Sequence, residues 1–567
     1  MLKVEVLKFG SSVLRSPSDL HIAVDEIYRR LRSGFRVLVV VSAFEGVTNE
    51  LMADVGDIVG TECPEAMAAY VATGEDRTAA LLHGSLHQYG LPSRLVNPRE
   101  ISLIAEGSLL ESTPIHADRI AVDRLFNQHS ILVLPGFYGI DAEGRTCLFG
   151  RGGSDLSALF LAAELDAECR LAKDVRGVYD ADPACATAPR RFSALSWTRA
   201  LEVSGPLIQK KALIEAFNRG LTFEVGRPNK AACTRVGHPH DEWAPPTVAA
   251  RALRIALVGC GVVGFGVYKT IKRYPDSFEI LHVVVRQPER YPDIERLTTD
   301  AGVALDSAVD VVLVCCGGKT FPYSLIVACL NSGKYVVTAN KAAIAAHGES
   351  LAPYIGDGKR LWYSAAVGGA LPALETLATL GEPVREIRGT VNGTCGVVLE
   401  AWSRGESRES AILHAQAQGF AEADPSQDLS GRDSADKLAL LISAAFGVWI
   451  RPEHISTRGI DTIADSPQGY KLIARARRSL SPERASPEIT ATVGPELLAP
   501  ESFLGKARGA ENRLEIELES GEIIRLRAQG AGRWPTSVSV LGDLHEIARL
   551  VEQTREVPVS QPITSHG

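Results

Sequence analysis

The chain has 567 residues, of which 45% are hydrophobic and 23% charged, and its formal net charge is −8 at pH 7. A single hydrophobic core rarely organises more than ~300 residues, so this length predicts several domains. The small net charge and the lack of Lys or Arg runs argue against nucleic acid or an anionic membrane as the main partner.

The ten cysteines show no paired metal-ligand spacing, and most lie in apolar runs such as VVLVCCGG, which favours buried free thiols. The amino-terminal run MLKVEVLKFG lacks the apolar core of a signal peptide, and no apolar run approaches the ~18–20 residues that span a bilayer. We therefore expect a cytoplasmic protein with reduced thiols.

In chain order, the first predicted elements are a strand at residues 4–7 and the turn LKFGSS. The N–H groups of such a turn can face an anion, with Lys8 as the point charge, although a plain glycine turn beside a solvated lysine is the commoner arrangement. Strand-like runs (FRVLVVVSAF, SILVLPGFYG, LTFEVG) then alternate with helix-like runs (DLHIAVDEIYRRLRSG, SDLSALFLAAELDAE). This alternation predicts an α/β domain over residues 1–237.

Residues 238–252 are predicted to be a linker, because the stretch GHPHDEWAPPTVAARAL is rich in proline and has no apolar period. Directly after it, RIALVGCGVVGFG predicts a strand, a glycine turn and a helix, which is the context of a dinucleotide-binding fingerprint. Gly259 allows the tight turn, Gly261 lets the backbone approach a pyrophosphate, and Gly264 lets the helix pack on the strand. A chance match in a glycine-rich loop is the alternative.

Three further residues belong to the predicted cofactor site. Val262 and Val263 lie within the glycine fingerprint, and the next strand, EILHVVV, is followed by Arg286. An arginine at this place, instead of Asp or Glu, can pair with a 2′-phosphate, which favours NADP over NAD.

Two later segments carry ionisable groups. Asn340 and Lys341 follow the strand of GKYVVTANKAAI, at the strand end where open α/β sheets bind ligands. In GFAEADPSQDLSGRDSADKLALL, Asp433 and Lys437 are spaced i, i+4 on a predicted helix and can face one pocket. An ordinary ion pair on a solvated helix is the alternative, but a lysine beside a bound nicotinamide can give a proton to a carbonyl oxygen.

Residues 253–553 resemble homoserine dehydrogenase. The shared motifs are the GxGxxG start, VVTANK, the NGT turn at residues 392–394, AEADPxxDLxGxDxxxKLxLL and QGAGRWPTSVSVLGDL. The resemblance implies a Rossmann NAD(P)-binding domain with an inserted α+β catalytic domain. The implied segments are a nucleotide domain at 253–389, a catalytic domain at 390–525, a return to the nucleotide domain at 526–553 and a tail at 554–567.

The same resemblance implies roles for single residues. Lys341 and Lys437 would contact the reacting oxygen, with Lys437 as proton donor. Glu422 and Asp433 would hold the substrate ammonium, and Gly532 would close over NADP(H). The acidic residue that helps this family to bind a monovalent cation is Ser364 here, so a Na⁺ or K⁺ site at the backbone of Val367 is in doubt.

Residues 1–237 resemble the catalytic domain of an aspartokinase, an α/β domain of the amino-acid kinase (carbamate-kinase-like) superfamily. The shared motifs are LKFGSSVL, VVSAFEGVTNEL, VATGEDRTAALL, LFGRGGSDLSALFLAAEL and KDVRGVYDADP. The resemblance implies a phosphate loop, an aspartate site, an organising carboxylate and contacts to ATP with Mg²⁺. The phosphate loop would consist of Lys8, Gly10, Ser11 and Ser12, and the aspartate site of Thr48, Glu75 and Arg151. Asp155 would be the organising carboxylate. The contacts to ATP with Mg²⁺ would come from Asp174, Tyr179 and Asp182.

The nucleotide side of this first half departs from the aspartokinase pattern. The usual KFGGTSV is shortened to KFGSSV, nearer to the turn of glutamate 5-kinases, and the usual DPR reads Asp182–Ala184 without its arginine. A lysine of the family falls on Pro206, for which Lys173, or Lys210 with Lys211, could compensate. The segment between the halves also leaves no room for the ACT domains that bind feedback inhibitors.

Together the resemblances predict a bifunctional enzyme. It would phosphorylate L-aspartate with ATP, and reduce L-aspartate 4-semialdehyde to L-homoserine with NADPH, most simply as a homodimer or higher homo-oligomer. One alternative keeps the dehydrogenase and makes the first half an inactive scaffold or ligand sensor. A glutamate kinase fused to a proline-pathway reductase ranks low, because that second half would carry a cysteine nucleophile instead of GCGVVGFG and the lysine cluster.

Overall fold

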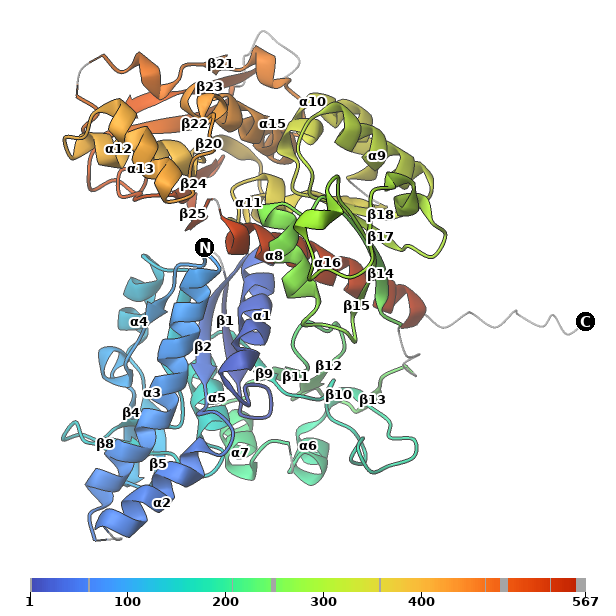
Figure 1. The fold of residues 1–567 in the computed structure, drawn as a ribbon. Helices are drawn as coiled ribbons and strands as arrows, with labels where there is room; N and C mark the ends of the chain where they lie inside the picture. Colours follow the sequence, from blue (N-terminus) through green and yellow to red (C-terminus); the bar gives the residue numbers. More distant parts are fainter. Residues whose placement is uncertain are drawn as a thin grey trace, which may run out of the picture.

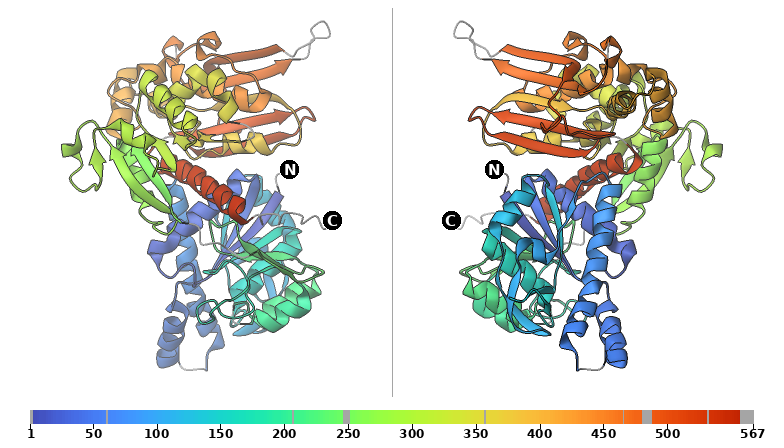
Figure 2. Two further views of the ribbon diagram at one scale, coloured as in Figure 1. Left: turned by 90° about the vertical axis from the view of Figure 1, so that its right-hand side faces the viewer. Right: turned by 90° about the vertical axis from the view of Figure 1, so that its left-hand side faces the viewer.

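The computed structural model describes residues 3–59, 62–205, 207–245, 251–355, 358–464, 466–479, 488–530 and 532–556. Figure 1 shows a first half, from blue to teal, below a second half, from green to red, with the red helix α16 (Arg533–Glu556) between them. The side views of Figure 2 agree on this arrangement. No helix in the described ranges is long and apolar enough to cross a membrane.

The first half is built on a mainly parallel sheet with strand order β13-β10-β12-β11-β9-β1-β2-β6-β3. Its strands are β1 (Lys3–Phe9), β2 (Phe35–Val41), β3 (Arg94–Leu95), β6 (Ile131–Pro135), β9 (Glu168–Ala172), β10 (Phe192–Leu195), β11 (Phe223–Gly226), β12 (Cys233–Val236) and β13 (Glu242–Trp243). The central strands are apolar on both faces because helices cover both faces. Side chains alternate along each strand, so Leu7 and Phe9 pack on one layer of helices and Val6 packs on the other.

The helices of the first half form two layers around this sheet. One face is covered by α1 (Leu20–Arg32) and α3 (Pro64–Gln88). The other face is covered by α4 (Arg119–Phe126), α5 (Gly153–Leu165), α6 (Trp197–Val203) and α7 (Lys210–Asn218). Helix α2 (Val47–Val59) packs on α3, and a small sheet of order β5-β4-β7-β8 lies nearby, formed by β4 (Ile104–Ser108), β5 (Glu111–His116), β7 (Tyr138–Ile140) and β8 (Thr146–Leu148).

The second half begins with a parallel sheet of order β16-β15-β14-β17-β18-β19. Its strands are β14 (Leu253–Val258), β15 (Phe278–Val284), β16 (Leu297–Thr298), β17 (Val311–Val314), β18 (Tyr335–Thr338) and β19 (Leu361–Trp362). Helices α8 (Val262–Ile271) and α16 cover one face, and α9 (Thr320–Asn331) and α10 (Lys341–Leu351) cover the other. This doubly wound order confirms the predicted Rossmann domain.

A mostly antiparallel sheet of order β21-β23-β22-β20-β24-β25 follows. Its strands are β20 (Val384–Thr390), β21 (Ser456–Thr457), β22 (Tyr470–Ser479), β23 (Glu488–Leu497), β24 (Glu511–Leu518) and β25 (Ile523–Gln529). Helices α12 (Gly393–Ser403) and α15 (Arg432–Phe446) pack on β22, with α11 (Ala373–Thr379), α13 (Arg408–Ala417) and α14 (Ser426–Leu429) beside them. Helix α15 also packs on α10, which brings the two parts of the second half together.

Several element boundaries differ from the predicted domain limits. Strand β13 joins the first sheet from inside the segment predicted as linker, because it pairs with β10. Strand β20 begins before residue 390, β25 continues past residue 525, and α16 extends past residue 553. Residues 246–250 of the predicted linker and 557–567 of the predicted tail lie outside the described residues.

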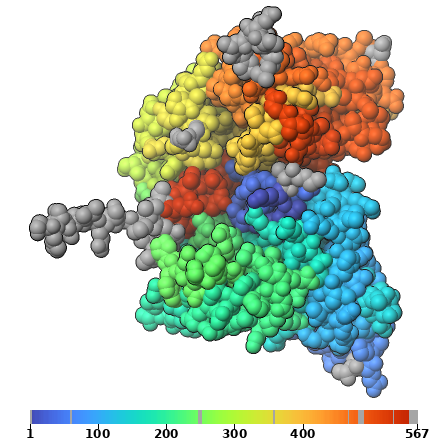
Figure 3. All heavy atoms as spheres, turned by 180° about the vertical axis from the view of Figure 1, so that it is seen from behind, coloured from blue at the N-terminus to red at the C-terminus, as the bar shows by residue number. Residues whose placement is uncertain are grey.

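The two halves share one apolar core. A continuous cluster of buried side chains includes Tyr28 and Leu31 of α1 together with Leu371, Leu526 and Val538 of the second half. The space-filling view of Figure 3 shows α16 as a red patch enclosed between the halves. The linker is therefore not the only connection between them.

Candidate active sites

A cavity of about 660 Å³ opens at the carboxyl end of β1 in the first half. It is lined by predicted site residues from five parts of the chain: Lys8, Gly10, Ser11, Ser12, Thr48, Glu75, Arg151, Asp155 and Asp174. The structure therefore brings together the phosphate loop, the predicted aspartate site and one predicted nucleotide contact.

A buried carboxylate holds two lysines at the base of this cavity. Asp155 Oδ1 lies 2.6 Å from Lys8 Nζ, and Asp155 Oδ2 lies 2.8 Å from Lys173 Nζ. Although burial opposes it, the two ammonium groups lower the pKa of Asp155 to about 2. Two lysines against one carboxylate leave an excess positive charge, which suits the phosphates of a nucleotide. Lys173, one of the lysines that could compensate for the missing family lysine, lines this cavity.

The lysine of the phosphate loop is closely confined. A Cβ on Gly10 would lie 2.7 Å from Lys8 Nζ, so a glycine at this position lets the lysine fold back toward Asp155. Burial lowers the pKa of Lys8 to about 8, against the opposing effect of Asp155. Lys8 is therefore still mostly charged at neutral pH.

Glu75 and Arg151 lie in the same cavity as the lysines. Glu75 Oε1 accepts a hydrogen bond of 3.0 Å from the backbone N–H of Ala43, and burial raises the pKa of Glu75 to about 8. Arg151 precedes the glycine turn at the start of α5 and is exposed. Within this cavity the Arg151 guanidinium can bind the carboxylate of an amino acid, and Glu75, once ionised, can bind its ammonium.

Two predicted nucleotide contacts lie elsewhere. Tyr179 forms an isolated bridge with Arg191, and Asp182 accepts a hydrogen bond of 2.9 Å from the N–H of Ala184 in an exposed loop. Neither residue is among those that line the cavity in the described part of the chain. Pro206, where the family lysine is missing, lies outside the described residues.

In the second half, the glycine turn has the backbone that a dinucleotide site needs. Gly259 has φ +94°, and a Cβ on Gly264 would lie 2.0 Å from the carbonyl oxygen of Gly259, so neither position tolerates a side chain. A Cβ on Gly261 would meet no atom within 4 Å, which leaves open space at the amino end of α8. That space fits the approach of a pyrophosphate to the helix N-terminus.

Positive side chains surround this turn. Arg286 is exposed just past β15, and its charge acts on Cys316, which follows β17; burial nevertheless raises the pKa of the Cys316 thiol. A cavity of about 350 Å³ is lined by Gly261, Arg290 and Arg533 among others. Gly532 lies one residue before Arg533 at the start of α16. Neither Arg290 nor Arg533 was predicted, because no motif marks them and they meet Gly261 only in the folded chain.

The second lysine cluster lies between α10 and α15. Asp433 Oδ1 is 2.8 Å from Lys341 Nζ, and Asp433 Oδ2 is 2.7 Å from Lys437 Nζ. Lys437 Nζ also donates to the carbonyl oxygen of Val391 at 2.7 Å. Although burial opposes it, the charges of Lys437 and Lys341 hold the pKa of Asp433 well below its usual range. In turn, the charge of Asp433 raises the pKa of Lys341.

Two hydrogen-bonding residues position this cluster. Asn392, of the NGT turn, donates to Asp428 at 2.7 Å and to Asp433 at 2.8 Å, and its side-chain oxygen caps α12. Asn340 caps α10 and donates to the carbonyl oxygens of Cys316 and Gly318 at 2.8 Å each. The position of Asn392 two residues after the end of β20, in the NGT turn, was the available signal for a site role.

Glu422 was predicted to share the ammonium site with Asp433. In the structure it is an exposed residue of the loop between α13 and α14, and its carbonyl oxygen accepts a hydrogen bond from Gln416. Asp428, whose pKa is raised by burial, lies closer to the cluster through Asn392. The role of Glu422 at the ammonium site stays a prediction.

The expected monovalent cation site at Val367 does not fit the residues present. Ser364 stands in place of the acidic residue, and both its N–H and its hydroxyl bind the carboxylate of Asp543. The carbonyl oxygen of Gly369 accepts a hydrogen bond of 2.7 Å from Ser539. Two carboxylates near this turn, those of Asp543 and Glu375, are paired with Arg32 of the first half.

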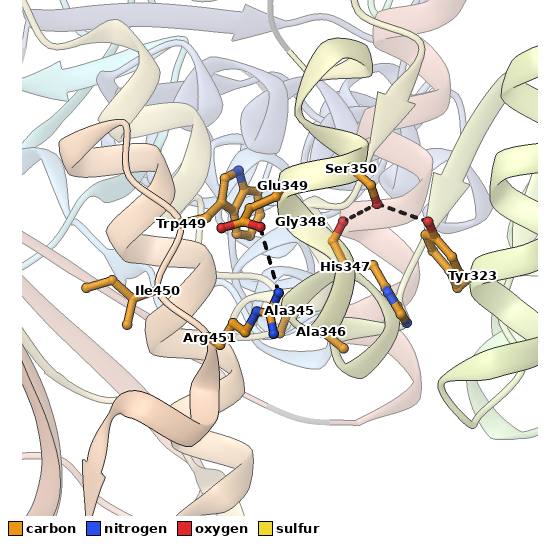
Figure 4. Close-up of a pocket in the computed structure, with 10 residues that line it drawn as sticks. All are labelled: Tyr323, Ala345, Ala346, His347, Gly348, Glu349, Ser350, Trp449, Ile450 and Arg451. Carbon is orange, nitrogen blue, oxygen red and sulfur yellow. Dashed lines mark hydrogen bonds and ion pairs between the residues drawn. The ribbon is translucent and has the colours of Figure 1, made fainter.

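A separate surface pocket of about 230 Å³ lies between α10 and the segment after α15. Figure 4 shows Ser350 between the carbonyl of His347 and the hydroxyl of Tyr323, and Arg451 turned toward Glu349. The rings of His347 and Tyr323 stack at 3.8 Å. None of the predicted site residues lines this pocket.

Comparisons with known proteins match three consecutive parts of the chain. Residues 3–216 match the model of the amino acid kinase family, residues 259–356 that of the homoserine dehydrogenase NAD binding domain, and residues 371–545 that of homoserine dehydrogenase.

Curated relatives agree with the second and third of these models. Homoserine dehydrogenase of Corynebacterium glutamicum is 33% identical over 324 residues, which cover 53% of this chain and 72% of that protein. The Bacillus subtilis enzyme is 33% identical over 319 residues, covering 52% and 72%. A solved homoserine dehydrogenase from Thiobacillus denitrificans is 27% identical, with a TM-score of 0.49 and coverage of 54% of this chain and 76% of that one.

Proposed function

From the membership of this chain in the homoserine dehydrogenase family, and from the amino acid kinase domain that precedes the dehydrogenase domains, we propose a bifunctional enzyme of the aspartate pathway. The first half phosphorylates L-aspartate to 4-phospho-L-aspartate with ATP and Mg²⁺. The second half reduces L-aspartate 4-semialdehyde to L-homoserine with NADPH. The observation that carries the second activity is the Lys341–Asp433–Lys437 cluster at the boundary between the nucleotide and catalytic domains.

The residues of the second half perform the proton chemistry of the reduction. A bound nicotinamide supplies the hydride to the aldehyde carbon. As negative charge develops on the aldehyde oxygen, Lys437 donates the proton that completes the alcohol. Asp433 and the carbonyl of Val391 fix the Lys437 ammonium, while Lys341 adds a second positive charge.

The cofactor preference follows from the charges near the glycine turn. Arg286 extends from the end of β15, where the adenine ribose of a dinucleotide is recognised in Rossmann domains. A guanidinium pairs well with a phosphate and poorly with a ribose hydroxyl. NADPH is therefore the proposed cofactor, and the reduction assay compares it directly with NADH.

The residues of the first half position and neutralise charge. ATP supplies the phosphoryl group, which passes to the β-carboxylate of aspartate while ADP leaves. Lys8 and Lys173 stabilise the negative charge on the transferring group, and Asp155 keeps the two lysines apart and oriented. Arg151 binds the α-carboxylate and Glu75 the ammonium of aspartate.

A second candidate function includes the reduction but not the kinase reaction. Tyr179 and Asp182 lie outside the lining of the cavity, and the loop lacks one glycine of the aspartokinase pattern. Both observations weaken the nucleotide side, whereas the three residues predicted to bind aspartate, Thr48, Glu75 and Arg151, all line the cavity. On this reading the first half is a scaffold or a sensor of a small amino acid.

The deciding experiment traps the acyl phosphate formed from ATP and aspartate with hydroxylamine. Wild type is expected to be active, and Lys8→Ala to lose activity by orders of magnitude, because a cation at the phosphoryl group is removed. Lys3→Ala, which removes an exposed lysine of the same strand, is the matched control. Absence of activity in wild type, together with NADPH-dependent reduction of the semialdehyde, would leave only the dehydrogenase.

A further inference from the structure

An arginine of the first half is buried inside the second half. Arg32, at the carboxyl end of α1, is 8% exposed. Its Nη2 lies 2.5 Å from Asp543 Oδ1, on α16, and 3.0 Å from Glu375 Oε1, on α11. Both carboxylates belong to the dehydrogenase half, so the charge of Arg32 is balanced entirely across the boundary between the halves.

The carboxylate that Arg32 holds also fixes the turn at residues 364–371. Asp543 accepts hydrogen bonds from the N–H of Ser364 at 3.2 Å and from its hydroxyl at 2.7 Å. The far side of the turn is held at Gly369, whose carbonyl accepts from Ser539; Ser539 in turn shares a hydrogen bond of 2.6 Å with Tyr28 of α1. Helix α1 therefore reaches this turn at two points through α16.

The turn is linked to the reduction site through packing contacts between neighbouring elements. It continues into α11, which packs on α15, the helix that carries Asp433 and Lys437. The turn also packs on β18, which ends just before Asn340 and Lys341. A shift of the turn would therefore affect the positions of both Lys341 and Lys437.

The contact between Arg32 and α16 requires a glycine at position 542. A Cβ on Gly542 of α16 would lie 2.1 Å from Arg32 Nη1 and 3.2 Å from Tyr28 Cε1. The glycine lets the guanidinium pass against the helix backbone. Without Arg32, two carboxylates would remain buried beside each other with no positive partner from α1, which is strongly unfavourable.

We propose that Arg32 is a positioning residue of the dehydrogenase: the kinase half supplies a fixed guanidinium at the turn where the second half lacks a fitting monovalent cation site. This rests on the proposed reduction activity. The dehydrogenase of this chain then needs no added Na⁺ or K⁺, and its catalytic geometry depends on the first half.

The test measures semialdehyde reduction by the full chain in KCl, NaCl and tetramethylammonium chloride at equal ionic strength. Wild type is expected to have the same kcat in all three salts. Arg32→Ala is expected to lose at least about tenfold in kcat, since two buried carboxylates lose their partner, and to regain part of it with guanidinium or K⁺. Arg32→Lys keeps the charge and is expected to retain most activity.

Arg29→Ala is the matched control, because Arg29 pairs with Glu26 within the first half. The melting temperature of each variant is measured in the same three salts and in guanidinium at a low concentration. A melting temperature of Arg32→Ala that rises with guanidinium or K⁺, but not with tetramethylammonium, supports a cation position at this site.

Three results would overturn the proposal: a wild type that requires Na⁺ or K⁺, an Arg32→Ala variant with unchanged kcat, or a loss of kcat and melting temperature that no cation restores. A wild type without any reductase activity would contradict the proposed function instead. In that case the salt response of the melting temperatures still decides whether Arg32 fills a cation position.

Discussion

At the scale of single residues, the two sites share one design: a buried carboxylate that holds two lysines. Asp155 binds Lys8 and Lys173, and Asp433 binds Lys341 and Lys437, each through both carboxylate oxygens. A carboxylate in this position lowers the cost of burying two ammonium groups and fixes where they point. Within each cluster two ammonium groups thus face one carboxylate, an arrangement that favours an anionic reaction centre.

Replacement of Lys437 by alanine is expected to lower kcat for semialdehyde reduction by at least ~100-fold, because a positioned general acid is lost. The affinity for NADPH should be nearly unchanged. Lys471→Ala is the matched control, since Lys471 is a part-buried lysine of the same domain that donates to the carbonyl of Ala507. Stopped-flow or steady-state assays decide; near-normal turnover in Lys437→Ala would remove this lysine from the mechanism.

The kinase activity should fall on the alkaline side of about pH 8. The pKa of Lys8 is lowered from 10.5 to about 8, so its positive charge is present below that pH and is lost as the pH rises through it. Glu75 gains its charge in the same range, so the pH profile of wild type must be compared with that of Lys8→Arg, in which the charge persists. An alkaline limb that stays in place in Lys8→Arg would assign it to another group.

Local spacing was sufficient to point to two features of the second half. The i, i+4 relation of Asp433 and Lys437 and the glycine fingerprint depend on one helix or one turn, so the sequence carries them. Arg32 gave no such signal, because its partners lie more than three hundred residues away and meet it only in the folded chain. The exposed position of Glu422 likewise depends on how a loop packs, which periodicity does not report.

At the scale of elements, α1 and α16 lie so close together that position 542 of α16 has no room for a side chain. Gly542→Ala places a methyl group against Arg32 and Tyr28, and is expected to destabilise the protein by ~1–3 kcal/mol through overpacking. Gly84→Ala is the control: Gly84 is an exposed glycine within α3 whose Cβ would meet nothing within 4 Å. That substitution should be neutral or stabilise by up to ~1 kcal/mol. Urea unfolding of both variants tests the difference.

The elements themselves were largely predictable from the sequence. Helix α1 and strands β2, β6 and β11 lie within the runs expected for them, and α5 begins one residue before its run, because apolar periodicity reports which faces are buried. The limits of the domains stay predictions, although β20, β25 and α16 extend across them. Strand β13 was missed since two residues in a proline-rich stretch give no periodic signal, and they become a strand only by pairing with β10.

At the scale of the whole molecule, a buried carboxyl group makes the boundary between the halves sensitive to pH. Asp25 of α1 is hydrogen-bonded to Tyr274 of the second half, and burial raises its pKa from 3.8 to about 7. The folded state therefore favours the protonated group. Protonated Asp25 contributes in full to the free energy of unfolding below the pKa that its carboxyl has in the unfolded chain, and this contribution is lost as the pH rises through about 7.

Between these two values, the free energy of unfolding of wild type should fall relative to that of Asp25→Asn by up to about 1.4 kcal/mol per pH unit. The asparagine stays neutral and keeps a hydrogen-bonding partner for Tyr274, so its stability lacks this component. Urea midpoints across the range measure the difference. Parallel pH dependences of the two proteins would show that Asp25 does not titrate between folded and unfolded states.

The place of α16 also bears on how the protein is made. Of the described helices it is the last to leave the ribosome, yet it completes the nucleotide domain and covers α1, which is synthesised near the beginning. At ordinary translation rates roughly 300 residues separate the end of the first half from α16, a delay on the order of 15–60 s. During that interval α1 already packs on β2 and α3, but its residues that face α16, among them Tyr28 and Arg32, lack that partner. Nascent chains at this stage are therefore candidates for chaperone binding, and early termination would harm the first half as well as the second.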